Sequence, residues 1–137
     1  MKIVLDTNVL VSGLLTPFHA PGEIVRMVSA GLLQLCYDAR ILTEYKQVLW
    51  RPKFDFDPAA VEALLDQIKA AGHSVVAQPL KKSLPDHSDE PFLAAAVAGK
   101  AASLVTGNLR HYPSTEFQGV RIFSPADFLS FYRSVQK

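Results

Sequence analysis

Four carboxylates stand where the sequence predicts ordered structure: Asp6, Glu44, Asp86 and Asp89. Asp6 follows the short apolar run Ile3–Leu5, which is typical of a buried strand in a parallel sheet. Ligands of open α/β sheets gather at the carboxyl ends of the strands. We therefore expect Asp6 to have a functional role rather than only to cap the helix that follows, a task Thr7 or Asn8 could perform.

A second strand pattern repeats this arrangement about a hundred residues later. Ser103–Thr106 is apolar enough for a buried strand and ends at Gly107 and Asn108. If both strands are parallel, their carboxyl ends meet at one edge of the sheet. Carboxylate and amide oxygens at that edge are hard donors of the kind that Mg²⁺ and Mn²⁺ prefer. The sequence thus predicts a divalent metal site.

Glu44 and the pair Asp86 and Asp89 each have an ordinary alternative role. Glu44 lies at the border of an apolar helical stripe, where it either faces a site or is simply solvated. Asp86 and Asp89 precede a helix, where acidic residues favour the positive end of the helix dipole. The small apolar run Phe92–Val97 favours the functional interpretation, because such a helix packs close to the sheet and holds Asp89 over the strand ends.

Two histidines lie near these acids in the sequence. His87 stands between Asp86 and Asp89, and His111 follows the last strand motif. Isolated histidines in loops are usually not metal ligands, so we leave both out of the predicted site.

The predicted elements alternate between strands and helices. Strands are expected at Ile3–Leu5, Leu32–Tyr37, Ser74–Ala77, Ser103–Thr106 and Val120–Phe123. Helices are expected at Val9–Leu15, Pro21–Ala30, Ala39–Arg51, Pro58 to Gly72, Asp89 to Gly99, and from Pro125 onward. This alternation predicts a three-layer α/β/α sandwich around a mostly parallel sheet of four or five strands.

Composition restricts the protein class. The 137 residues predict a single domain spanning 1–137, and 49% hydrophobic with 20% charged residues is typical of a globular protein. The net charge of +1 neither supports nor excludes nucleic-acid binding. The one cysteine, Cys36, lies in an apolar run and is expected to be a buried thiol. The chain shows no signal peptide or membrane span, so we expect a cytoplasmic protein.

The motifs together resemble the PIN-domain family, the fold of VapC-like toxin ribonucleases. The resemblance covers almost the whole chain, with four pieces in the right order: Ile3–Asn8, Glu44, Asp86–Asp89 leading into Phe92–Ala96, and Leu104–Asn108 leading into Leu109–Pro113. Members of the family usually carry a fourth acid where this chain has Asn108. That departure predicts one firmly held ion and a weak second site.

The resemblance implies Mg²⁺- or Mn²⁺-dependent hydrolysis of RNA phosphodiester bonds, in a toxin that pairs with an antitoxin. Asp6, Glu44 and Asp89 are then the catalytic residues and metal ligands. The supporting residues are Asn8, Asp86, Thr106 and Asn108. The predicted RNA-binding cations are Arg40, Lys46, Lys81, Lys82 and Arg110, although each alone is more readily explained as a solvated surface charge.

Two other functions fit parts of the pattern. A haloacid-dehalogenase-type phosphatase also begins with a strand that ends in Asp, but it requires a second Asp two residues later, where this chain has Asn8. A non-catalytic PIN-like module that binds RNA or protein would explain Asn108 as the result of metal loss.

The resemblance also suggests a homodimer. Four aromatic residues could form an exposed patch or instead pack beneath the Pro52–Pro58 connection: Phe18, Trp50, Phe54 and Phe56.

Overall fold

The computed structural model describes residues 1–136. Its strands are β1 (Lys2–Leu5), β2 (Gln34–Tyr37), β3 (His73–Ser74), β4 (Ser103–Val105), β5 (Glu116–Phe117) and β6 (Val120–Phe123). Its helices are α1 (Thr7–Leu15), α2 (Ala20–Ser29), α3 (Ala39–Leu49), α4 (Pro58–Ala71), α5 (Glu90–Ala98) and α6 (Pro125–Val135). Three short 3₁₀ turns complete the described elements: η1 (Pro52–Phe54), η2 (His87–Asp89) and η3 (Leu109–His111).

The strands form one sheet in the order β3-β2-β1-β4-β6-β5. All neighbouring pairs are parallel except β5 and β6, which run antiparallel. In the centre, Leu5 of β1 lies opposite Val105 of β4. The residues that follow these two strands, Asp6 and Thr106, therefore emerge side by side at one edge of the sheet.

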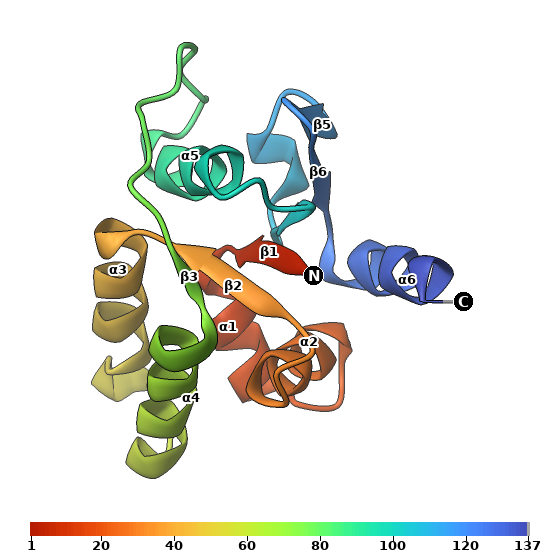
Figure 1. The fold of residues 1–137 in the computed structure, drawn as a ribbon. Helices are drawn as coiled ribbons and strands as arrows, with labels where there is room; N and C mark the ends of the chain where they lie inside the picture. The colour runs from red at the N-terminus through yellow and green to blue at the C-terminus, as the bar shows by residue number, and fades with distance from the viewer. Residues whose placement is uncertain (137) are drawn as a thin grey trace.

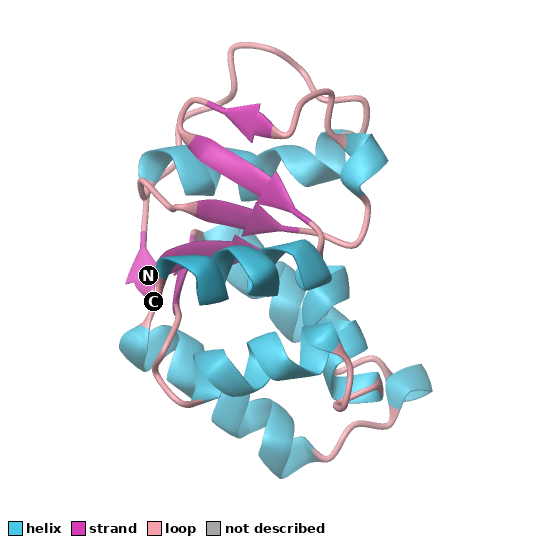
Figure 2. Ribbon diagram, turned by 90° about the vertical axis from the view of Figure 1, so that its right-hand side faces the viewer, coloured by secondary structure: helices cyan, strands magenta, loops and turns pink. Residues whose placement is uncertain are grey.

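Helices cover both faces of the sheet (Figures 1 and 2). Helix α5 packs on β1, β2 and β4, and Figure 1 shows α1, α2 and α6 on the opposite side of the sheet. The small side chains Ala94, Ala95 and Ala96 of α5 are buried, which allows this helix to approach the strands closely. The three-layer α/β/α sandwich with a mostly parallel sheet is confirmed.

Helix α3 occupies the side of the molecule toward which the central strands point (Figure 1). It starts at Ala39 because the Asp38 side chain caps it, accepting a hydrogen bond of 2.9 Å from the Ile41 N–H. Its apolar stripe, including Ile41, Tyr45 and Leu49, is buried in the core. The border residue Glu44 is half-buried, and this helix thereby brings it to the edge where β1 and β4 end.

The structure corrects one predicted strand and adds a strand that was not predicted. The strand predicted at Ser74–Ala77 is instead His73–Ser74, because pairing with the end of β2 stops there and Val76 is 88% exposed. The sheet has six strands because β5 and β6 form a short hairpin that the sequence did not predict. Gln118 and Gly119 connect them with φ of 48° and 86°, the left-handed conformation that a two-residue hairpin turn requires.

Helix and strand boundaries otherwise differ from the predictions by a few residues. Helix α1 begins at Thr7 rather than Val9, because the Val9 N–H already bonds to the Asp6 carbonyl. Helix α3 ends at Leu49 rather than Arg51, and β2 begins at Gln34 rather than Leu32. No helix within residues 1–136 combines the length and apolarity needed to cross a membrane.

Candidate functional site

Asp6 lies at the centre of the edge where the parallel strands end. Its N–H donates to the Val105 carbonyl at 3.0 Å, which continues the pairing of β1 with β4. Its Oδ2 accepts a hydrogen bond of 2.9 Å from the Thr106 hydroxyl, and the same hydroxyl oxygen accepts one of 3.0 Å from the Asn108 N–H. Since Asp6 and Thr106 are almost fully buried, this chain of hydrogen bonds fixes the orientation of the Asp6 carboxylate.

The Asp6 carboxylate faces other negative charges. Burial raises its pKa to about 6, the Thr106 hydrogen bond opposes that rise, and the charges of Asp89 and Glu44 add to it. The three acids therefore lie close enough for their charges to interact across the edge of the sheet. At neutral pH Asp6 is mostly ionised in this acidic surrounding.

Two hydroxyl groups position Glu44. The Thr7 hydroxyl, in the first turn of α1, donates a hydrogen bond to Glu44 Oε2. The hydroxyl of the fully buried Tyr45 donates to the Leu5 carbonyl at 2.5 Å. The second bond ties α3 to the last residue of β1, so Glu44 is held beside Asp6 by its own helix and by α1.

Asp86, Asp89 and His111 form a second group beside the strand ends. One ligand atom from each of the three lies within 4.8 Å of the other two. Asp89 ends η2 and is buried, with its Oδ2 3.0 Å from Nδ1 of His111 at the end of η3. Partial burial raises the pKa of Asp89, while the hydrogen bond from His111 opposes that rise.

Asp86 is the exposed member of this group. Its Oδ1 accepts hydrogen bonds from the Ser88 N–H at 2.9 Å and from the Ser88 hydroxyl at 2.7 Å. These bonds lower the pKa of Asp86. They also close the turn that begins η2, so this carboxylate is held by its local backbone rather than by the sheet.

The hydroxyl of Tyr112 is buried next to both groups of acids. Tyr112 is 6% exposed, and its hydroxyl has no hydrogen-bond partner among the described residues. Burial raises its pKa strongly, and the charges of Asp6, Asp89 and Asp86 raise it further. The hydroxyl is therefore a free hydrogen-bonding group within the field of these carboxylates.

The arrangement fits a divalent cation. Within residues 1–136, no lysine or arginine forms an ion pair with Asp6, Glu44 or Asp89. Buried acids without a cationic partner are costly, and hard oxygen donors suit Mg²⁺ and Mn²⁺. The donor set and its uncompensated charge both favour a metal centre at this edge.

Comparison with known families agrees with this geometry. The family profile described as PIN domain matches residues 2–110, which run from β1 into η3 and include all the acids described above. This chain belongs to the PIN domain family. Neither the comparison with curated proteins nor that with solved structures returns a match. The PIN domain is a nuclease fold that typically holds a divalent metal in an acidic cluster.

The supporting residues of this PIN domain have unequal surroundings. Asn8 Oδ1 accepts a hydrogen bond of 3.2 Å from the Gly107 N–H, so this amide joins the start of α1 to the loop after β4. Asn108 contributes its N–H to Thr106, and its half-buried side chain forms no hydrogen bond with the described residues. Asn8 and Asn108 thus support the loop around Asp6 mainly by connecting backbone segments.

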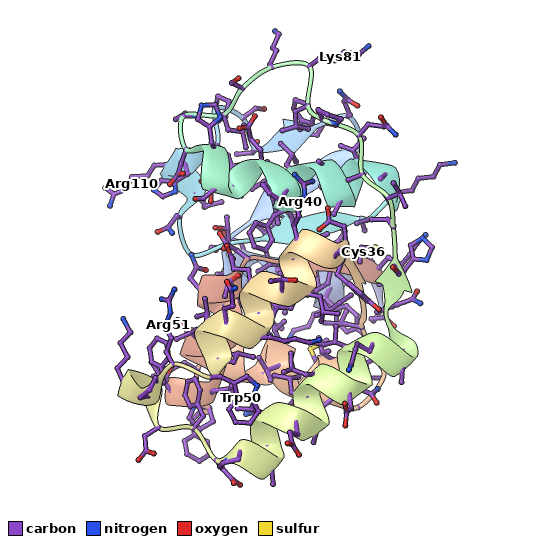
Figure 3. All side chains as sticks on the ribbon, turned by 90° about the vertical axis from the view of Figure 1, so that its left-hand side faces the viewer. Cys36, Arg40, Trp50, Arg51, Lys81 and Arg110 are labelled. Carbon is purple, nitrogen blue, oxygen red and sulfur yellow. The ribbon has the colours of Figure 1, made fainter. Side chains whose placement is uncertain are left out.

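The predicted RNA-binding cations are exposed, and they surround the PIN domain's acidic edge unevenly. Arg40 pairs with Asp38 at 3.0 Å and lies in the first turn of α3. Figure 3 shows Arg110 at the edge near the start of α5 and Lys81 on the loop that precedes this helix. Lys46 and Lys82 are exposed as well. No single basic cluster emerges among them.

Sequence reasoning missed three residues of this site: Thr7, His111 and Tyr112. Thr7 belonged to the strand-end motif but was considered only as a cap. His111 was set aside as an isolated loop histidine, although η3 turns it against Asp89. Tyr112 follows His111 directly and is almost fully buried in the structure, but the sequence of this predicted loop carries no pattern that indicates the burial.

Proposed function

We propose that this PIN domain is a metal-dependent ribonuclease that hydrolyses RNA phosphodiester bonds. The observation that carries the proposal is the buried Asp6 carboxylate, which faces the charges of Glu44 and Asp89 without a lysine or arginine partner among the described residues. A site that only stabilised the fold would gain by pairing or removing these charges. These uncompensated charges favour the binding of a divalent cation, which can in turn bind the anionic phosphodiester.

Mg²⁺ or Mn²⁺ is the proposed cofactor. Asp6, Asp89 and Glu44 would hold it directly or through water. When bound, the ion would supply an acidified water for attack on phosphorus and offset the charge of the phosphodiester. Mg²⁺ usually keeps several waters and takes few protein ligands, which agrees with the small number of acids available.

The chain's own residues orient this chemistry. Thr106 holds Asp6 Oδ2, and Thr7 holds Glu44 Oε2, so a hydroxyl group orients each of these two carboxylates. The bond from Tyr45 to Leu5 keeps α3 against β1. These restraints place two acids in fixed positions before any ligand arrives.

RNA binding is proposed to depend on the exposed cations around the edge: Arg40, Lys46, Lys81, Lys82 and Arg110. Contacts with phosphates make affinity fall as salt rises. These cations are spread over α3, the loop before α5, and η3. We therefore expect each to contribute a little to RNA affinity, with no single dominant residue.

The central experiment compares RNA cleavage by the wild type and by Asp6→Asn with Mn²⁺ present and with chelator. Asp66→Asn is the matched control, because Asp66 is an exposed acid of α4 whose carboxylate is 3.9 Å from Lys69. We expect cleavage by the wild type and the control with Mn²⁺ only, and none by Asp6→Asn. Undiminished cleavage by Asp6→Asn would remove Asp6 from the reaction.

We further propose that the nuclease is the toxin of a toxin–antitoxin pair, on the basis of its resemblance to VapC-like ribonucleases. The test is growth after induced expression of the wild type and of Asp6→Asn. Arrest by the wild type alone, relieved by co-expression of a protein encoded beside it, supports this role. Equal growth of both strains at equal protein levels contradicts it.

A homodimer is proposed from exposed aromatic residues. Phe18 is 92% exposed and Trp50 is 44% exposed. Phe54 and Phe56 instead stack on each other at 5.3 Å between ring centroids and are partly buried, which agrees with packing at the Pro52–Pro58 connection. Light scattering at micromolar concentration should give twice the monomer mass for the wild type and less for Phe18→Ser. A monomer mass throughout rejects the dimer.

The alternative is a non-catalytic PIN module that binds RNA or protein. Asn108 favours it, since an amide attracts a divalent ion less strongly than a carboxylate does. Calorimetric titration with Mn²⁺ separates the two functions, because such a module binds no metal. Family membership favours either over an aspartate-nucleophile phosphatase.

A further inference from the structure

The group formed by Asp86, Asp89 and His111 differs in chemistry from the three acids predicted from sequence. It contains an imidazole, and its ligand atoms come within 4.8 Å of one another. Two ligands that lie at right angles around one ion, each about 2.1 Å from it, are about 3.0 Å apart. His111 Nδ1 and Asp89 Oδ2 have this separation, at 3.0 Å.

We propose that His111 is a nitrogen ligand of the same divalent ion, which it binds together with Asp86 and the shared ligand Asp89 in addition to the acids named above, so that this site prefers Mn²⁺ and Co²⁺ to Mg²⁺. His111 Nδ1 lies 3.0 Å from Asp89 Oδ2 in the structure, and the ion would take the place of this direct contact. The inference rests on the proposed function only in placing a divalent ion at this edge of the sheet.

A second observation points to a ligand here. The hydroxyl of Tyr112, the residue after His111, is buried without a hydrogen-bond partner among the described residues. Leaving such a buried group unpaired is energetically unfavourable. A hydrated ion among Asp6, Asp86 and Asp89 would bring water molecules that can pair with this hydroxyl. The same cation offsets the acids whose charges act on Tyr112.

The surroundings of the group allow an ion to enter. Asp86 is exposed and His111 is 36% exposed in its side chain, while Asp89 forms the buried floor. Ser88 occupies only Oδ1 of Asp86, which leaves Oδ2 available. Asn108, on the neighbouring loop, brings no negative charge to the site. The His111 imidazole would therefore supply a metal ligand where few carboxylates are available.

The nitrogen ligand dictates the metal preference. Imidazole binds Mn²⁺ and, more strongly, Co²⁺, whereas Mg²⁺ prefers oxygen donors. A site of three carboxylates alone would distinguish these metals much less. The order of affinities is therefore a consequence of His111.

The test uses untagged protein and the metals alone. Calorimetry with Co²⁺, Mn²⁺ and Mg²⁺ is compared for the wild type, His111→Gln and His87→Gln. His87 is the matched control, because it is an exposed histidine of η2 that pairs with Glu90 rather than with Asp89. We expect His111→Gln to lose about tenfold or more in Co²⁺ affinity and little in Mg²⁺ affinity. The control should bind both like the wild type.

Pulsed electron paramagnetic resonance of bound Mn²⁺ gives the direct readout. Modulation from a ¹⁴N nucleus should appear in the wild type and in His87→Gln and disappear in His111→Gln. Melting curves with chelator establish that the variants are folded. Absence of ¹⁴N modulation in the wild type, its persistence in His111→Gln, or no Mn²⁺ binding at millimolar concentration each overturns the proposal.

The outcome separates this inference from the proposed function. Mn²⁺-dependent RNA cleavage without nitrogen coordination leaves the nuclease intact and rejects His111 as a ligand. Nitrogen coordination without cleavage of any RNA keeps the ligand and rejects the nuclease.

Discussion

The two groups of acids at the strand ends are held by different means. Asp6 and Thr106 follow the central parallel strands, are buried, and are fixed by backbone pairing and by a continuous chain of hydrogen bonds. Asp86 and His111 lie in or beside the 3₁₀ turns η2 and η3 and are more exposed. Asp86 is held by bonds to Ser88 within its own turn, and His111 by a single bond across to Asp89. The comparison suggests that the strand ends set the position of the site before metal binds, whereas the turns adjust to the ion.

The largest expected effect comes from the strand ends. Asp6→Asn should abolish metal-dependent cleavage and also stabilise the metal-free protein. The pKa of Asp6 is about 6 in the folded state and near 3.9 when unfolded, so the folded protein binds more protons between these values. The free energy of unfolding of the wild type therefore falls as pH rises from about 4 to about 7.

The free energy of unfolding of Asp6→Asn should not fall with pH in this way. At pH 7 it should be about 2–3 kcal/mol higher than that of the wild type. Chemical denaturation of both proteins with chelator at pH 5 and pH 7 measures these free energies of unfolding. A wild type as stable at pH 7 as at pH 5, with the variant unchanged, would contradict the burial of an uncompensated charge.

The second prediction removes the restraint on Asp6. Thr106→Val deletes the hydroxyl that donates to Asp6 and accepts from Asn108, so we expect a loss of about 1–3 kcal/mol in the free energy of unfolding. Cleavage should fall by about tenfold, and most at low pH, since Asp6 loses a bond that favours its ionised form. Thr106→Ser keeps the hydroxyl and should behave as the wild type. Equal losses in both variants would instead indicate a packing defect.

The third prediction changes charge on the loop after β4. Asn108→Asp should tighten Mn²⁺ binding by about tenfold, because a carboxylate attracts the ion more strongly than an amide. The added charge should also lower the melting temperature with chelator and make it depend more on metal. Calorimetry and paired melting curves measure both effects. Unchanged affinity places residue 108 outside the site, as a residue of the turn after Gly107.

The smallest effect is expected in the turns. Ser88→Ala removes one of the two bonds to Asp86 and leaves the backbone bond, so Mn²⁺ affinity should fall by only about two- to threefold. Ser83→Ala, at an exposed serine of the same loop, is the control. If Ser88→Ala reduced Mn²⁺ affinity by about tenfold, the size of the cleavage loss expected for Thr106→Val, the turns would be as strictly required as the strand ends.

The sequence predicted best those features that depend on local pattern. Apolar runs that contain β-branched residues predicted β1 and β6, because each signal lies within the strand it specifies. The strand β5 was missed because a two-residue strand carries almost no pattern, and its existence depends on the turn at Gln118 and Gly119.

The candidate site also contains residues that local pattern predicts and residues that only tertiary packing brings together. Asp6 was identified because it directly follows a buried strand. The contact between His111 and Asp89 joins residues 22 positions apart and depends on how two 3₁₀ turns pack together. No periodicity encodes such packing, so the imidazole was excluded on the basis of its loop position alone.

Cys36 offers an opportunity for labelling chemistry. It is fully buried in β2, and burial raises the pKa of its thiol. Since the thiolate is the reactive form, maleimide reagents should leave the folded protein unmodified. A cysteine introduced at the exposed Arg110 or Lys81 would then be the single reactive thiol, ready to carry a fluorophore or spin label beside the acidic edge. The native thiol would react only when β2 separates from its neighbours, so its labelling rate would report how often the sheet opens at β2.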